Sequence, residues 1–243
     1  MINKIILSPP FSNIYPQISG TTKITGTYTL EKRRGLWRVL TTLRKTDSGW
    51  INNVGLRNPG IKKFNKKNSI ISIALKNSSE WPEVFDILLS KKEEYNILGI
   101  EFNISCPNSF TSNINNKLID EAKKEFKNIS IKMPHITNKN ELEKVCNTNS
   151  NFIHISNSRP HPKGAASGTS LIKENIKNIE FVRNNFKNIN IIAGGGIYNY
   201  NQYLDYLNAG ASHFSLSTLL INPMKTYNFI KTANKKNLIQ EIK

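Results

Sequence analysis

The sequence predicts an α/β protein with the fold class of a TIM (β/α)8 barrel, and three observations support this prediction. Short apolar runs rich in Ile alternate with polar stretches long enough for helices, which is typical of parallel strands covered by helices. Six clear runs and three weaker ones can be counted, and this number favours a barrel over a doubly wound sheet. The 243 residues suit one barrel of about 250 residues, so we expect a single domain over residues 1–243.

The apolar runs predict the strands in chain order. The first three are weak because they are short or interrupted by polar residues, whereas the last six are almost unbroken apolar sequence, as expected of strands buried on both faces. The expected strands are residues 5–7, 22–29, 51–52, 70–75, 97–104, 129–133, 152–155, 189–193 and 213–216.

The segments between these runs predict helices, because their apolar residues recur at helical spacing. The expected helices are residues 81–92, 118–126, 171–184 and 200–208. Gly210 follows the last of them and is a suitable helix stop.

Composition excludes several classes of protein. The two cysteines, Cys106 and Cys146, cannot form a disulfide framework, and neither lies in a CxxC pair or a Cys/His cluster with zinc spacing. We therefore expect no metal site. No apolar run approaches the ~20 residues that span a bilayer, and the N-terminal sequence lacks the features of a signal peptide. We expect a cytoplasmic protein in a reducing compartment.

The chain is strongly basic, and the sequence leaves the reason open. Lys and Arg total 34 against 17 Asp and Glu, a net charge of +17. Such a charge suits a nucleic-acid partner or anionic small ligands. However, Lys, Asn and Ile are all frequent, as in AT-rich genomes, and the lysines are scattered without an Arg-rich arm or an aromatic RNA-binding motif. Compositional drift is the simpler explanation, and we expect no nucleic-acid partner.

Polar residues follow the predicted strands at regular places. In a TIM barrel the active site lies at the carboxyl ends of the strands, so these residues are the candidates for chemistry. They are Asn52, Asn103, Cys106, Asn108, Lys132, Asn157, Ser158, Gly194, Gly195, Gly196, Ser217 and Thr218.

Each candidate also has a structural interpretation. An Asn after a strand is often a turn or cap residue, and Cys146 in a helical segment is best explained as a small core residue. Cys106 stands beside Pro107, which ends a strand and would leave the thiol on a loop. Lys132 lies within an apolar run, and a buried Lys needs a partner or an anion. The glycine triplet before the last strand suits a phosphate site.

Seven blocks of the sequence carry a resemblance to a known family. They are LEKRRG (30–35), GWINNVGLRNPG (49–60), EFNISCPN (101–108), ISIKMP (129–134), SNSRPHPKGAASG (156–168), IIAGGGI (191–197) and AGASHFSLST (209–218). In this order they resemble the class 1 dihydroorotate dehydrogenases, which are FMN-dependent TIM barrels. The SCPN and GLxNPG blocks are the most specific.

The resemblance implies an FMN at the barrel mouth and dihydroorotate as substrate, in the biosynthesis of UMP. It assigns Lys132, Gly168, Gly195, Gly196, Ser217 and Thr218 to the cofactor, and Asn52, Asn103, Asn108, Asn157 and Ser158 to the substrate. Cys106 occupies the position of the catalytic base, which takes a proton while a hydride passes to flavin N5. The implied assembly is a homodimer, with or without an electron-transfer subunit.

Two positions depart from the family pattern. Gly26 stands where the family has a lysine that contacts both flavin and substrate, and Lys23 points to the opposite face if the strand alternates normally. Ser217-Thr218 replaces the usual Gly-Thr, which requires a backbone conformation that suits a side chain.

Two other functions remain as alternatives. A tRNA-dihydrouridine synthase is another FMN barrel with a catalytic Cys, and the basic charge would suit its RNA, but the SCPN and GLxNPG blocks fit it poorly. A degenerate barrel with reduced or no activity is the second alternative, because Gly26 replaces a functional lysine.

Overall fold

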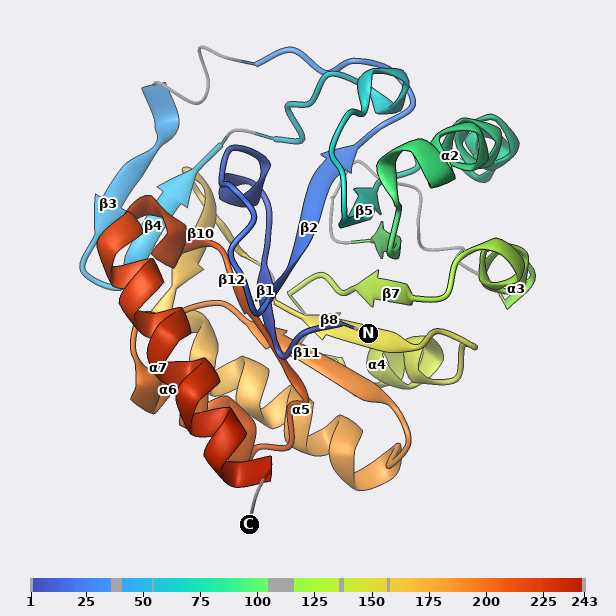
Figure 1. The fold of residues 1–243 in the computed structure, drawn as a ribbon. Helices are drawn as coiled ribbons and strands as arrows, with labels where there is room; N and C mark the ends of the chain where they lie inside the picture. The colour runs from blue at the N-terminus through green and yellow to red at the C-terminus, as the bar shows by residue number, and fades with distance from the viewer. Residues whose placement is uncertain are drawn as a thin grey trace.

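The structure is a computed structural model, and it describes residues 2–35, 41–53, 55–104, 116–135, 138–156 and 158–241. Eight parallel strands close into a barrel in the order β1-β12-β11-β8-β7-β6-β5-β2, with helices around the outside (Figure 1). The strands are β1 (Ile5–Leu7), β2 (Thr21–Tyr28), β5 (Ser69–Ile73), β6 (Gly99–Asn103), β7 (Ile129–Lys132), β8 (Phe152–Ile155), β11 (Asn190–Gly194) and β12 (His213–Leu216). This arrangement confirms the predicted TIM barrel.

The helices cover the outer face of the barrel (Figure 1). They are α2 (Trp81–Tyr95), α3 (Asn116–Glu125), α4 (Lys139–Cys146), α5 (Ile172–Asn185), α6 (Tyr200–Asn208) and α7 (Pro223–Glu241). A capping box between Asn199 and Gln202 begins α6, and Gly210, with φ at +106°, follows its end as predicted. No helix in the described ranges is both long and apolar enough to cross a membrane.

Strand alternation separates an apolar outer core, between strands and helices, from the interior of the barrel. In β8, for example, Ile153 and Ile155 belong to the main core with the helices, whereas Phe152 belongs to a second, smaller cluster inside the barrel. That inner cluster closes the amino-terminal end of the barrel with Ile6, Ile24, Ile70, Phe152 and Ile192. Above this apolar base the inward positions are polar.

A second sheet stands apart from the barrel strands. It is antiparallel, in the order β3 (Arg44–Thr46), β4 (Gly49–Asn52), β10 (Gly164–Gly168) and β9 (Arg159–His161). The predicted strand at 51–52 belongs to β4 and not to the barrel. It pairs with β3 across a tight turn and with β10, and it is only partly buried, so its short apolar run came from a surface hairpin.

Candidate active site

Two of the predicted residues lie side by side at the carboxyl ends of barrel strands. Asn103 ends β6 and Lys132 ends β7, and the strand register makes them direct neighbours. The apolar residues between the inward positions, Phe102 and Ile131, face the outer core. The alternation of each strand therefore directs Asn103 and Lys132 into the barrel at its carboxyl end.

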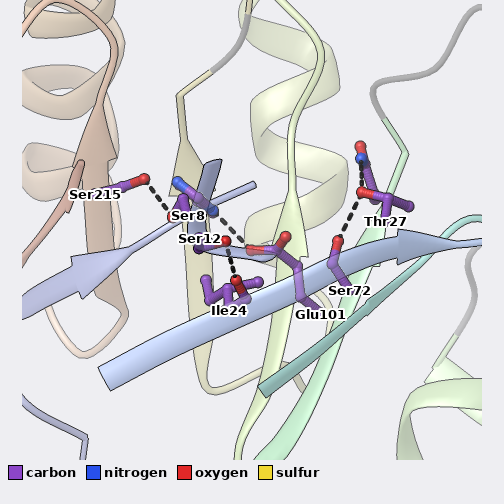
Figure 2. Close-up of polar contacts among 9 residues, drawn as sticks. Ser8, Ser12, Ile24, Thr27, Ser72, Glu101 and Ser215 are labelled. Atoms are coloured by element: carbon purple, nitrogen blue, oxygen red, sulfur yellow. Dashed lines mark hydrogen bonds and ion pairs between the residues drawn. The ribbon is translucent and has the colours of Figure 1, made fainter. Parts of the chain in front are cut away.

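Hydroxyl groups from two other strands hold Asn103. Its Nδ2 donates to Oγ1 of Thr27 at 2.8 Å, and that oxygen lies 3.0 Å from Oγ of Ser72 (Figure 2). These three side chains come from β6, β2 and β5 and are all buried. The amide of Asn103 is thus positioned by a short hydrogen-bonded chain inside the barrel.

A carboxylate and an imidazole meet below this chain. Nδ1 of His154 lies 2.7 Å from Oε2 of Glu101, and both side chains are 0% exposed. Glu101 is inward because Ile100 and Phe102 on either side of it pack against the helices. The barrel therefore encloses an ionisable pair directly under its polar rim.

The charges of this interior group are coupled. Burial alone would raise the pKa of the Glu101 carboxyl, but His154, Lys132 and a hydrogen bond from Ser72 outweigh it, and the pKa lies below its usual value. Burial lowers the pKa of Lys132, and Glu101 opposes that shift. Burial also lowers the pKa of His154. We therefore assign an ionised Glu101, whose negative charge balances one positive charge among its partners His154 and Lys132.

The glycines form a cradle at the ends of β10 and β11. Gly195 and Gly196 have φ values of +82° and +83°, which glycine adopts readily. A Cβ on Gly196 would collide with the carbonyl of Gly168, so the two strand ends touch. Gly168 itself has φ at +123°.

Side chains from two helices orient the peptides of this turn. Nδ2 of Asn175 donates to the carbonyl of Gly194 at 2.9 Å, and the Tyr206 hydroxyl donates to that of Gly195 at 2.7 Å. In a trans peptide the N–H points away from the C=O. The N–H groups of Gly195 and Gly196 therefore face away from α5 and α6. Backbone donors of this kind fit the phosphate end of FMN.

Ser217 suits its position at the end of β12. Its φ of −127° is open to any residue, and its Oγ donates to the carbonyl of Pro9 at 2.8 Å. Thr218 begins the short helix η6 (Thr218–Ile221) directly after it. The replacement of glycine by serine therefore does not distort the turn, and the described residues fit a phosphate-bearing flavin.

The remaining predicted residues lie elsewhere or outside the described ranges. Asn52 ends β4 and pairs with Ala165, and Ser158 lies just before β9, so both belong to the second sheet and its approach. Cys106, Asn108 and Asn157 lie outside the described residues. Cys146 is buried in α4, and burial raises the pKa of its thiol to about 12, as suits a core residue. No cluster of metal-ligating side chains occurs within the described ranges.

The structure also decides the question of the missing lysine. Nζ of Lys23 donates to the carbonyl of Tyr15 at 2.6 Å, on the face opposite to the inward Ile24. Lys23 therefore does not replace the family's lysine. Gly26 has φ at +121°, and a Cβ there would collide with the carbonyl of Ser72.

Glu101 and His154 were not among the predicted site residues. The signal that marked Lys132, a charged residue within an apolar strand, is also present in both of their strands. Their pairing needed the strand register and could not be found from either strand alone.

Comparisons with known proteins concern the family and the fold of the chain. The sequence model of the family described as "Dihydroorotate dehydrogenase" matches residues 117–238. A putative dihydroorotate dehydrogenase A (fumarate) of Aquifex aeolicus is 26% identical over 79% of this chain and 76% of its own length. The catalytic subunit of a dihydroorotate dehydrogenase B (NAD(+)) of Staphylococcus carnosus is 27% identical over 74% and 69%, respectively.

A solved structure shares the fold. The crystal structure of DHODH from Eimeria tenella in complex with ferulenol superposes with a TM-score of 0.67 over 98% of this chain and 82% of that protein. The sequence identity of this pair is 14%, so the likeness concerns the fold alone.

Proposed function

The chain belongs to the dihydroorotate dehydrogenase family, and on this premise we propose that it oxidises dihydroorotate to orotate with FMN, in the biosynthesis of UMP. The observation that carries the proposal is the neighbouring pair of Asn103 and Lys132 at the carboxyl ends of β6 and β7. An amide can donate to and accept from the imide groups of the substrate ring. A cation beside it would stabilise the negative charge that a flavin gains on reduction.

The reaction removes two hydrogens from adjacent carbons of the substrate ring. In the proposed mechanism the Cys106 thiolate takes a proton from carbon 5, a hydride leaves carbon 6, and the double bond of orotate forms between them. FMN, when bound, supplies the acceptor for the hydride. Asn103 orients the ring through its amide, which Thr27 holds in place, and Lys132 maintains a positive charge at the rim.

The thiol of Cys106 sets a requirement on the site. A thiol with a pKa near 8.5 is mostly protonated at neutral pH. The site must therefore favour the thiolate, for which a nearby cation is the usual means. The rate of proton removal should increase with pH until the thiol is fully ionised.

The first experiment follows the flavin spectrum of the purified protein under anaerobic conditions. Dihydroorotate should bleach the visible flavin band. Cys106→Ala should slow the bleaching by at least about 100-fold, the lower range of what a positioned acid–base group contributes. Cys146→Ala is the matched control and should bleach at the rate of the unmodified protein, because Cys146 is a buried core residue.

Three outcomes would contradict the proposal. A colourless protein that cannot be loaded with FMN would favour a degenerate barrel. An unchanged rate in Cys106→Ala would remove Cys106 as the base. Tight tRNA binding that weakens steeply with salt would favour a dihydrouridine synthase.

A further inference from the structure

The proposed mechanism leaves the most deeply buried charged groups without a role. Glu101 is the acidic side chain that the barrel buries completely, among the residues described. His154 is equally buried, and its Nε2 has no hydrogen-bond partner within the described part of the chain. Burying ionisable groups destabilises a protein unless they are well paired, so this pair invites a functional explanation.

We propose that Glu101 and His154 form a positioning pair that keeps Lys132 charged and thereby tunes the reduction potential of the bound flavin. The inference rests on the proposed function, because it assigns Lys132 to the cofactor. Beyond that assignment, the inference makes the Glu101 carboxylate the counter-charge of Lys132 and makes His154 the hydrogen-bond donor that holds this carboxylate.

The strand register places the three groups together. Glu101 pairs with Ser130, which pairs with Phe152, whereas Lys132 lies one inward step higher and pairs with His154. To reach His154 two strands away, the Glu101 side chain must cross β7 between its inward residues Ser130 and Lys132. The carboxylate therefore lies near Lys132, and the two groups interact electrostatically.

Charge balance explains the part played by each group. Glu101 faces Lys132 from β6 and His154 faces it from β8, while the inward residues nearby on β5 and β7, Ser72 and Ser130, are uncharged. Nδ1 of His154 lies 2.7 Å from Oε2 of Glu101, and because an ionised carboxylate can only accept, the imidazole is the donor in this pair. The carboxylate is then held by the imidazole and remains the negative partner of Lys132.

The Glu101→Gln variant removes this counter-charge at nearly constant shape. Lys132 would then be a cation in a largely buried position without its partner, and it should lose its proton within an accessible pH range. The FMN-free variant should become more stable relative to the unmodified protein as the pH rises from 7 to 10. The sign follows because a Lys whose folded pKa is depressed stabilises the folded state above that pKa and loses this contribution as the pH falls.

The reciprocal variant should respond in the opposite direction. In Lys132→Met the Glu101 carboxylate loses its positive partner. The folded protein should therefore bind a proton more tightly, either on Glu101 or on His154. Stability should then fall as the pH rises from 5 to 8. The double variant Glu101→Gln/Lys132→Met should show neither trend.

The midpoint potential of the flavin in the FMN-bound protein is a second measurement. In Glu101→Gln the midpoint potential of the flavin should fall more steeply with pH in the range where Lys132 titrates. The additional slope should be about 30 mV per pH unit, which corresponds to a tenfold change in the reduction equilibrium. The double variant should lack the steep segment. His154→Gln, which restores a neutral donor, should retain the profile of the unmodified protein.

The controls separate this inference from the proposed function. His213 is a half-buried histidine at the other end of the barrel, and His213→Asn should leave the potential profile unchanged. Stability curves of both single variants that run parallel to that of the unmodified protein would overturn the pairing. Failure to oxidise dihydroorotate would overturn the proposed function alone, because the stability curves need neither substrate nor flavin.

Discussion

Gly26 illustrates how one backbone position can exclude a functional side chain. Its φ of +121° is rarely open to residues with a Cβ. The Asn13 side chain holds both polar groups of this residue, since Oδ1 accepts from the Gly26 N–H at 2.8 Å and Nδ2 donates to its carbonyl. The lysine that relatives are expected to carry here therefore cannot be restored by substitution alone.

Substitution at Gly26 should test this reasoning. Gly26→Ala should destabilise the protein by about 2–4 kcal/mol, because backbone strain adds to the collision with the Ser72 carbonyl. Gly55→Ala is the matched control: Gly55 also has a positive φ, but within the described structure a Cβ there would have no neighbour within 4 Å, so the loss should be about 1 kcal/mol. Urea denaturation measures both, and equal losses would contradict the assignment.

Gly26→Lys extends the test to function. The new side chain should destabilise the protein at least as much as alanine does and should not increase the rate of flavin bleaching. A faster rate in a stably folded variant would mean that the backbone around Gly26 can adapt.

At the scale of elements, barrel strands that are buried between the helices and the barrel interior were predictable. Residues 5–7, 152–155 and 213–216 match β1, β8 and β12 at both ends, because a short, mainly apolar run between polar segments is typical of a buried strand. The second sheet was not predicted. Its strand β9 is short, contains Pro160 and is largely exposed, so it forms only through pairing with β10.

The helix α7 was also missed, for a different reason. Lys and Asn residues interrupt its apolar positions, and of its described side chains Phe229, Ile230 and Ala233 belong to the apolar core. Burial by neighbouring elements stabilises such a helix more than its own pattern does. The candidate site divides in the same way. The placement of Asn103 and Lys132 at strand ends was predictable, whereas the Glu101–His154 pair depends on a contact between strands that are not adjacent.

The contact between the ends of β10 and β11 gives a prediction for cofactor binding. Gly196→Ala should push the Gly168 carbonyl away and weaken FMN binding at least tenfold, about 1.4 kcal/mol. Gly210→Ala is the control, since Gly210 also has a positive φ but lies at the amino-terminal end of β12, where its Cβ would meet the Arg183 side chain. Its stability should fall while the FMN dissociation constant stays within about threefold. Flavin fluorescence titration measures both, and unchanged affinity in Gly196→Ala would remove the cradle from the cofactor site.

At the scale of the whole molecule, the barrel combines an apolar base with a charged interior and a basic surface. Glu101, His154 and His213 lie inside or at the ends of the barrel, and all three pKa values are lowered. For His213 burial, followed by Lys4, lowers the pKa to about 4. Each group is therefore harder to protonate in the folded protein than in the unfolded chain.

These shifts predict that the protein is sensitive to acid. A histidine with a lowered folded pKa loses its stabilising contribution as the pH falls from about 6.5 toward that pKa, and a carboxyl with a lowered pKa does so below about 4.3. The melting temperature should therefore fall between pH 7 and pH 4. His213→Phe, which can still pack against Phe152, should lose less over this range, because one of the groups that resists protonation is gone.

Salt can separate these buried groups from the surface charge. The net charge of +17 also destabilises the folded protein through repulsion, and acid increases it further. Half-molar NaCl screens exposed charges over a few ångströms but acts much less on buried ones. Salt should therefore raise the melting temperature at each pH without removing the difference between the unmodified protein and His213→Phe. If salt abolished that difference, the acid sensitivity would originate at the surface and not in the barrel interior.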